Sequence, residues 1–329
     1  MEESGESTAS DAASEPVTVP ASVLARYRKF SLYNSPYPAH DRACAVDLYP
    51  ESNVGVSPVA GEVLDTRTVG CPDREYAVDH DHLIVIDTGD HVARVLHVDP
   101  AVEAGDEVTV GDPLGDMVRS GFFGRWVDNH VHLEFRDPDR NPYRASGSRP
   151  LVADVDVTAL AWDGTGTVVE TGPSHAVLDA PAPALAAVAD DDPGFVAVAD
   201  DDGRPLDGGL AHYTGGGFPG TGVPDAVAGG GADGGDDDDD DDGRSLDGGP
   251  VRFLGREVGT RVGRHVDWGA VDVLANGERI TGLSLFAARG DAATGAKLVT
   301  RPEAGDPTFA VGDEVRVAVV AGDDPVRLG

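Results

Sequence analysis

Short apolar runs separated by turn residues recur along this chain and predict β-strands. Leu83-Ile84-Val85-Ile86 is one such run, with Gly89 following soon after it. No stretch of the sequence sustains the 3.6-residue apolar period of an amphipathic helix. The 43 glycines and 23 prolines also suit turns better than helix interiors. The sequence therefore predicts an all-β protein.

The length of 329 residues is enough for two domains, each with a sizeable core. Residues 1–22 are small, polar and acidic, so we expect a disordered tail there. Residues 23–150 hold seven of the ten histidines and form the first predicted domain. Residues 151–329 form a second, β-rich domain, with a flexible Gly/Asp-rich insert at about 215–249.

The insert contains an unbroken run of aspartates, Asp236 to Asp242. Like charges at this density cannot pack together, so we expect a solvated acidic loop. Calcium binding is the alternative interpretation, although the residue spacing of an EF-hand loop is missing. The second domain shows no catalytic constellation, because its three histidines have no recognisable partners in the sequence.

The formal net charge of −34 changes the picture of the surface. Of the 25 basic residues only Lys29 and Lys297 are lysines. Repulsion among so many like charges opposes compaction unless salt screens it. At 1 M ionic strength the screening length is about 3 Å, so distant charges no longer repel one another. This composition resembles that of proteins from the salt-rich cytoplasm of halophilic archaea. Nucleic acid is an unfavourable partner, because its phosphates require a basic surface.

The first residues carry neither the basic start nor the apolar stretch of a secretory signal. No run of about 18 apolar residues occurs, so the sequence predicts no membrane span and no membrane partner. We therefore expect a soluble, cytoplasmic protein. In a reducing compartment Cys44 and Cys71 are expected to be free thiols rather than a disulfide. The sequence predicts no particular oligomeric state.

The segment His130-Val131-His132-Leu133-Glu134-Phe135 carries the first candidate chemistry. In a strand, alternate side chains share a face, so His130, His132 and Glu134 point one way. The apolar residues between them point the other way and can pack against a core. Imidazole is a good zinc ligand, so the polar face of this strand is a candidate metal site.

Further candidates precede this segment in a definite order. His97 ends a short apolar strand, and residues 102–115 follow it with the glycine and aspartate pattern of a hairpin-like turn. Upstream, His40 and Asp47 bracket Ala45-Val46, just before Ser57-Pro58-Val59-Ala60-Gly61-Glu62-Val63.

This ordered set resembles the LytM/lysostaphin-type zinc metallopeptidases, the peptidoglycan endopeptidase class. The resemblance covers about Ser35 to Tyr143. It implies a LytM-type antiparallel β-sandwich for the first domain. It also implies that His40, Asp47 and His132 bind Zn²⁺, leaving a position open for water. His97 and His130 match the two histidines that flank that water. Either could accept a proton from the water while the other stabilises the oxyanion, and His130 is the predicted acid/base. The implied function is zinc-dependent hydrolysis of a peptide or amide substrate by metal-activated water.

The sequence departs from the family pattern at two places near the site. The first His and Asp of that family are usually four positions apart, whereas His40 and Asp47 are seven apart. Either a loop absorbs the difference, or Asp41 or Cys44 replaces one ligand. The aromatic stretch Gly121-Phe122-Phe123-Gly124-Arg125-Trp126 also replaces small polar residues. It should reshape the cleft, so the family's substrate does not carry over.

Two other interpretations of the first domain remain to be weighed. One is a non-catalytic binding or scaffold protein that retains the metallopeptidase-like fold. The other is a biotinyl- or lipoyl-type carrier domain, but this domain has only Lys29 and no lysine at the turn after Leu114. His80 and His82 flank Asp81 in an acidic stretch, where they are expected to be solvated or to form an adventitious metal site.

Overall fold

We describe a computed structural model of the chain that covers residues 15–182, 194–222, 248–290 and 295–328. Residues 1–14 of the expected tail and residues 223–247 of the expected insert lie outside the described residues. The aspartate run Asp236 to Asp242 is among them. The predicted all-β class is confirmed, since the regular secondary structure of the described chain is almost entirely β-strand.

Helices are few and short in the described ranges. They are α1 (Ala21–Leu24), α2 (Pro38–Asp41) and the 3₁₀ turn η1 (Pro302–Ala304). In the part of the chain that is described, none reaches the length and apolar character needed to cross a membrane.

The strands of the first half run from the N-terminus to about residue 154. They are β1 (Val17–Pro20), β2 (Lys29–Ser31), β3 (Val46–Tyr49), β4 (Val54–Val56), β5 (Gly61–Gly70), β6 (His80–Asp87), β7 (Val92–Leu96), β8 (Val98–Pro100), β9 (Glu107–Val108), β10 (Pro113–Met117), β11 (Val131–Arg136) and β12 (Leu151–Asp154).

The strands of the second half continue to near the C-terminus. They are β13 (Val157–Leu160), β14 (Thr165–Gly172), β15 (His175–Leu178), β16 (Phe195–Val198), β17 (Asp207–Leu210), β18 (Gly215–Gly217), β19 (Pro250–Phe253), β20 (Arg256–Val262), β21 (His265–Trp268), β22 (Val271–Ala275), β23 (Glu278–Ile280), β24 (Gly282–Leu285), β25 (Ala287–Arg289), β26 (Lys297–Val299) and β27 (Glu314–Ala321).

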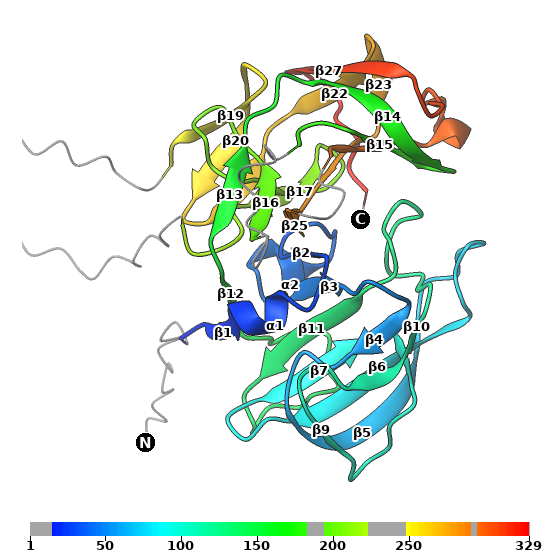
Figure 1. Ribbon diagram of the computed structural model, residues 1–329, viewed down its shortest axis with the longest axis vertical. Helices are drawn as coiled ribbons and strands as arrows, with labels where there is room; N and C mark the ends of the chain where they lie inside the picture. Colours follow the sequence, from blue (N-terminus) through cyan, green and yellow to red (C-terminus); the bar gives the residue numbers. More distant parts are fainter. Residues whose placement is uncertain (1–14, 183–193, 223–247, 291–294, 329) are drawn as a thin grey trace, which may run out of the picture.

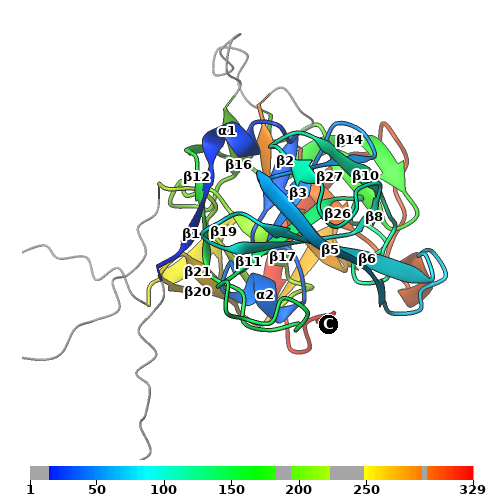
Figure 2. The same cartoon turned by 90° about the horizontal axis from the view of Figure 1, so that it is seen from below.

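One large sheet continues from the first half of the chain into the second. Its strand order is β13-β16-β25-β2-β3-β11-β7-β6-β5-β9, so β2 joins β3 of the first half to β25 of the second. A second large sheet, from β19 to β23 in spatial order, consists of second-half strands alone. The two halves form the lower and upper lobes of Figure 1, with β2 and α2 between them. In the view from below, β5 and β6 lie in front and β27 lies behind them (Figure 2).

The hydrophobic cores also connect the halves. Phe30 of β2 packs edge-on against Phe195 of β16, with ring centroids 5.0 Å apart. A smaller buried cluster combines Tyr49, Phe123, Trp126 and Val127 of the first half with Tyr213 and Val299 of the second. Burial of these apolar side chains therefore depends on both halves being in place.

Two segments expected to be flexible contain regular structure. Val17–Pro20 lies within the expected tail but forms β1, which pairs in parallel with β12. Gly215–Gly217, at the start of the expected insert, forms β18 between β17 and β21. In both cases backbone pairing with distant strands compensates for weak local patterning.

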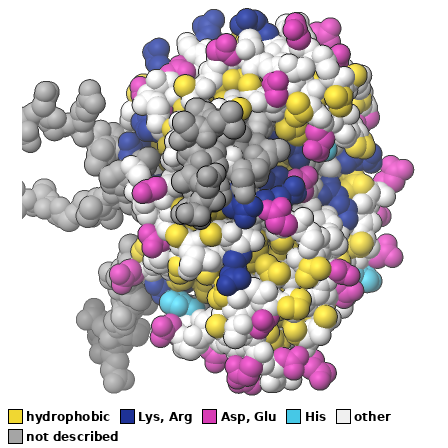
Figure 3. Space-filling model, in the orientation of Figure 1, with side chains coloured by type: hydrophobic (Ala, Val, Ile, Leu, Met, Phe, Trp, Pro, Cys, Tyr) yellow, Lys and Arg dark blue, Asp and Glu magenta, His cyan; other side chains and the backbone are white. Residues whose placement is uncertain are grey.

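Acidic side chains are spread over both lobes on the face shown in Figure 3. Arginine and lysine side chains lie among them rather than forming one broad basic surface on that face. On this face the acidic side chains of the described residues are therefore not gathered at a single site.

His212 in the second half provides a stability prediction. Its side chain is fully buried, and burial lowers its pKa to about 3. Because the unfolded chain has a histidine pKa near 6.5, unfolding takes up a proton at acidic pH. The stability contributed by keeping His212 neutral is complete above pH 6.5 and is lost as the pH falls towards 3.

Urea unfolding should therefore show this loss in the protein but not in a His212→Leu variant. Between pH 7.5 and pH 5.0 the free energy of unfolding should fall by about 2 kcal/mol more in the unmodified protein. All other titrating groups are common to both proteins, so the difference isolates His212. Parallel pH profiles for the two proteins would contradict the prediction.

Candidate metal centre

Two neighbouring strands and a short helix bring three polar side chains together. β11 pairs with β3 so that His132 stands opposite Asp47. On the other side of β3, Ser31 of β2 stands opposite Asp47. His40 lies on α2, which begins with a proline, a residue suited to the first turn of a helix. All three side chains are buried.

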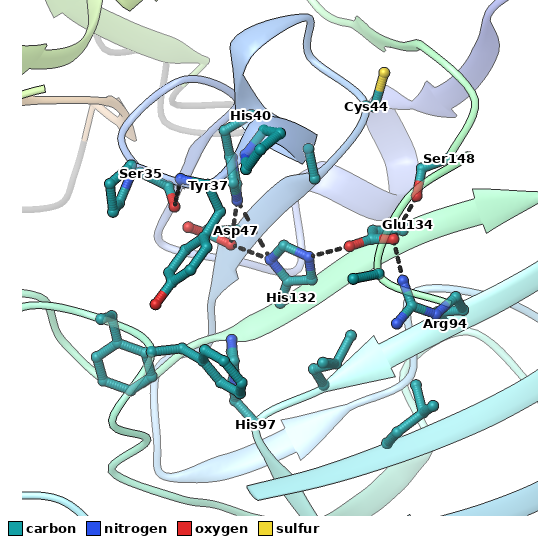
Figure 4. Close-up of a pocket in the computed structure, with 18 of the residues that line it drawn as sticks. Ser35, Tyr37, His40, Cys44, Asp47, Arg94, His97, His132, Glu134 and Ser148 are labelled. Atoms are coloured by element: carbon teal, nitrogen blue, oxygen red, sulfur yellow. Dashed lines mark hydrogen bonds and ion pairs between the residues drawn. The ribbon is translucent and has the colours of Figure 1, made fainter. Parts of the chain in front are cut away.

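Atom Oδ1 of Asp47 lies at the centre of this group. It is 2.9 Å from Nδ1 of His132 and 3.5 Å from Nε2 of His40. The two imidazole atoms are 3.4 Å from each other. In the described part of the chain, these three residues form the group whose potential ligand atoms all lie within 4.8 Å of one another. Figure 4 shows the three side chains converging.

His40 and Asp47 are seven positions apart, and a turn between them lets both side chains reach the same point. The helix ends after Asp41, and Ala43 adopts a left-handed backbone conformation with φ of 50°. Asp41 is exposed, whereas Cys44 lines the pocket with its Sγ 3.7 Å from the carbonyl oxygen of Arg42. Neither of these suggested substitutes belongs to the group of converging atoms.

The three side chains fit a zinc ion in both chemistry and spacing. Ligand atoms bound to tetrahedral zinc at about 2.1 Å lie about 3.4 Å apart, close to the separations measured here. Nδ1 of His40 donates its proton to the carbonyl oxygen of Leu32 at 2.8 Å. The lone pair of Nε2 therefore faces the Asp47 carboxylate, and a cation between them would relieve that repulsion.

His132 is held between two carboxylates. Its Nδ1 donates to Asp47, and its Nε2 donates to Oε1 of Glu134 at 2.9 Å. Glu134 is itself bound by Arg94, Ser148 and Arg136, the last at 3.3 Å. Figure 4 shows Arg94 and Ser148 on the side of Glu134 away from His132. This network fixes the orientation of the His132 ring.

The charges of this network shift several pKa values. Burial alone would raise the pKa of the Asp47 carboxyl, but His130, His40 and His132 outweigh it and hold that pKa well below its usual range. Burial would lower the pKa of His132, yet its bonds to Asp47 and Glu134 raise it to about 9. Nδ1 of His132, the nitrogen that would bind a metal, faces Asp47 and donates its proton to that carboxylate.

His130 lies beside the three converging side chains. Its Nδ1 donates to the carbonyl oxygen of Asp128 at 2.9 Å, so its Nε2 faces Oδ1 of Asp47 at 3.4 Å. The rings of Phe123 and Tyr49 lie against it, with centroids 4.7 Å and 5.2 Å away. Burial lowers the pKa of His130 to about 4, so this imidazole is neutral near pH 7.

Asp128 is held in turn by the two lysines of the chain. Nζ of Lys29 lies 2.5 Å from Oδ2 of Asp128, and Nζ of Lys297 lies 3.2 Å from Oδ1. Both lysines are buried, and burial lowers the pKa of Lys29 to about 8 despite the neighbouring carboxylate. Buried charges of this kind require such pairing. Lys297 belongs to β26, so the second half supports the His130 loop.

His97 projects into the same pocket from the break between β7 and β8. Its backbone φ of 70° is left-handed, which is uncommon for a residue other than glycine and interrupts the strand there. Nδ1 of His97 donates to Oδ2 of Asp81 at 2.6 Å. Ser120 donates to the same oxygen, also at 2.6 Å. The His97 ring centroid lies 5.0 Å from that of His130.

Asp81 is a site residue that the sequence interpretation missed. The stretch around it was expected to be a solvated acidic turn, but β6 begins at His80 and Asp81 is fully buried. Strand alternation places Asp81 on the same face as Leu83 and Val85, a signal that was available in the sequence. Burial would raise the pKa of Asp81, but His97 and Ser120 lower it to about 2. His80 itself is exposed.

The four histidines of the site and Asp47 line one pocket with a cavity volume of about 460 Å³; the histidines are His40, His97, His130 and His132. The aromatic stretch after Gly121 forms part of its wall through Phe122 and Phe123. Tyr37 meets Phe122 edge-on with ring centroids 5.6 Å apart. Tyr213 of the second half also lines the pocket. The wall beside the histidines is therefore largely aromatic.

Two models of one protein family match most of the chain. Residues 18–153 match the "Domain of unknown function (DUF8155) N-terminal domain", and residues 158–320 match the "DUF8155 C-terminal domain". The chain belongs to the DUF8155 family. All five candidate residues, His40, Asp47, His97, His130 and His132, lie in the DUF8155 N-terminal domain. The match is to this family and not to the LytM-type peptidases that the motif order resembles.

Comparison with curated proteins finds no match to this DUF8155 chain. Among solved structures, the NMR solution structure of lysostaphin is similar over 88% of this chain and 96% of that one. The sequence identity is 13% and the TM-score is 0.23. A similarity at this level says nothing about shared function, so the case for a metal centre rests on its side chains.

Proposed function

We propose that this DUF8155 protein is a zinc-dependent hydrolase that cleaves a peptide or amide bond. The observation that carries the proposal is the convergence of His40, Asp47 and His132 within 4.8 Å in a pocket. Two imidazoles and one carboxylate are a ligand set typical of catalytic zinc, which keeps a position open for reaction.

In this proposal His40 and His132 would bind zinc through the nitrogens that face Asp47, and Asp47 through its carboxylate. When bound, zinc supplies Lewis acidity that polarises a scissile carbonyl and makes a water molecule more acidic. The protein contributes orientation. Leu32 and Glu134 occupy the second nitrogen of His40 and of His132, respectively, which leaves the inward nitrogen of each ring for the metal.

His97 is the proposed proton acceptor. Its hydrogen bond to Asp81 commits Nδ1 as a donor and leaves the lone pair of Nε2 available. The Asp81 carboxylate would stabilise the imidazolium that forms when Nε2 accepts a proton. That proton can then be donated to the departing amine. Nδ1 of His130 donates to a backbone carbonyl instead of a carboxylate, and the lowered pKa of His130 disfavours this role.

The aromatic wall bears on the class of substrate. Tyr37, Phe122, Phe123 and Tyr213 line the pocket beside the histidines and offer apolar surface. Side chains of this kind favour contact with apolar groups. We therefore propose substrates with an apolar group next to the scissile bond.

Metal titration with activity measurements tests the proposal. Protein stripped with a chelator in concentrated salt should bind one equivalent of zinc, and cleavage of a mixed peptide library should rise with zinc occupancy. Peptides cut by the loaded protein are identified by mass spectrometry. No zinc binding would refute the proposal. One equivalent of zinc without cleavage of peptides or amides would instead support a non-catalytic binding or scaffold protein.

A further inference from the structure

The three proposed zinc ligands lie in the first half of the chain. The second half contacts the segment whose backbone carbonyl binds one of them, His40. Asp207 begins β17, and its side chain is completely buried. Its carboxylate does not reach into the pocket. It accepts hydrogen bonds from three consecutive residues, Ser31, Leu32 and Tyr33, at the end of β2.

The distances of these bonds indicate a tight clamp on that segment. Oδ1 of Asp207 accepts from Oγ of Ser31 at 2.5 Å. Oδ2 accepts from the backbone nitrogens of Leu32 at 2.6 Å and of Tyr33 at 3.3 Å. A carboxylate can accept from all three donors, whereas an amide has one oxygen. With that oxygen facing the two backbone N–H groups, the uncharged amide would turn its NH2 group towards Ser31 and lose the bond that Ser31 donates.

The clamped segment leads directly to a proposed zinc ligand. The carbonyl oxygen of Leu32 accepts the Nδ1 proton of His40 at 2.8 Å. The backbone nitrogen of Leu32 donates to Asp207 and its carbonyl oxygen accepts from His40, so Leu32 connects the two side chains. A carbonyl held in this position fixes both the tautomer of His40 and the direction of Nε2 towards Asp47.

A second contact supports the same segment. Nδ2 of Asn34 donates to Oγ of Ser284 at 2.6 Å and to the carbonyl oxygen of Leu285 at 3.3 Å. The backbone nitrogen of Asn34 donates to Oγ of Ser31 at 3.0 Å. Ser284 and Leu285 belong to β24, which pairs with β17. The segment from Ser31 to Asn34 is therefore held by two adjacent strands of the second half.

We infer that Asp207 is a positioning residue for the metal centre, and that the second half of the chain acts through it on zinc affinity. The inference rests on the proposed function for the existence of the metal centre. Asp207 holds Leu32, Leu32 orients His40, and His40 presents Nε2 to the metal. Partners that orient a ligand in this way typically contribute about 10–100-fold to metal affinity.

Zinc titration of Asp207→Asn tests the inference against a matched control. Asp200 is also a buried carboxylate of the second half, but it binds Arg204 and local backbone. We expect Asp207→Asn to raise the zinc Kd by about 10–100-fold and Asp200→Asn to leave it nearly unchanged. The visible spectrum of Co²⁺-loaded Asp207→Asn should also differ from that of the unmodified protein.

A double-mutant cycle with His40→Ala shows whether Asp207 acts through that ligand. The readout is the free energy of unfolding. Because the clamp on Leu32 remains, Asp207→Asn should destabilise the His40→Ala protein as it does the unmodified protein. The loss of zinc affinity in Asp207→Asn alone is then assigned to His40. If Asp207→Asn does not fold, Ser31→Ala removes one bond of the clamp, and we expect a smaller rise in the zinc Kd.

The outcomes separate this inference from the proposed function. Normal zinc affinity in a folded Asp207→Asn protein would overturn the positioning role of Asp207 but not the proposed function. If Asp207→Asn does not fold, normal zinc affinity in Ser31→Ala would have the same meaning. Equal losses in Asp207→Asn and Asp200→Asn would also overturn it, because they would show a general effect of destabilisation. No zinc binding by the unmodified protein would overturn both proposals.

Discussion

Asp47→Ala should abolish zinc binding and lower peptide hydrolysis to the rate of the chelator-treated protein. Asp47 is the anionic member of the converging group, and its Oδ1 lies within 3.5 Å of nitrogens from His40 and His132. Two imidazoles alone would lack the charge and the third ligand that a catalytic zinc site needs. Zinc content after dialysis, measured by atomic emission, gives the result directly.

Two further variants separate loss of the ligand from loss of structure. Asp47→Asn keeps the size of the side chain, and it should also bind zinc poorly because the amide carries no charge. Asp81→Asn alters another buried carboxylate, the one that binds His97 behind the pocket wall, and should retain the full equivalent of zinc. A full equivalent of zinc in Asp47→Ala would show that the metal, if bound, lies elsewhere.

His97→Ala should lower hydrolysis by about 10²–10⁴-fold while zinc remains bound, since general acid–base catalysis contributes that much. His97 is outside the converging ligand group but faces the same pocket. Its ring centroid lies 5.5 Å from that of His132. The loss should appear in kcat, because the proton acceptor acts on the reacting group rather than on substrate binding.

Asp81→Asn is the companion measurement for this role. It replaces the carboxylate that accepts the Nδ1 proton of His97, so the ring can turn or change tautomer. We expect a smaller loss of kcat than in His97→Ala, with zinc content unchanged. Turnover within about threefold of the unmodified protein in His97→Ala would remove this residue from the proton-transfer step, because acid–base catalysis contributes far more.

Local patterns predicted the strands around the site because those strands alternate. His132 and Glu134 were expected on one face of a strand, and they are joined by a hydrogen bond of 2.9 Å. The all-β class followed from short apolar runs between turn residues and from the absence of a helical apolar period. The convergence of His40 with Asp47 came instead from a family resemblance, since no local pattern relates a helix residue to a strand seven positions later.

Contacts between the halves could not be predicted from local patterns. Asp207 and Ser31 are separated by 176 positions, and the sequence between them contains nothing that marks the pair. The second half was expected to hold no part of a catalytic constellation, yet Tyr213 lines the pocket and Asp207 holds the segment before His40. Such pairs depend on strand order, which places β2 beside β25.

The position of β2 between β3 and β25 also determines when the sheet around the candidate ligands is completed during synthesis. Residues 40, 47 and 132 leave the ribosome early, but β25 ends at Arg289. Until that strand arrives, β2 presents an unpaired sheet edge, which is prone to pairing with other chains. The candidate ligands are therefore synthesised well before the sheet that supports them is complete, and a fragment ending near residue 153 would keep that edge exposed.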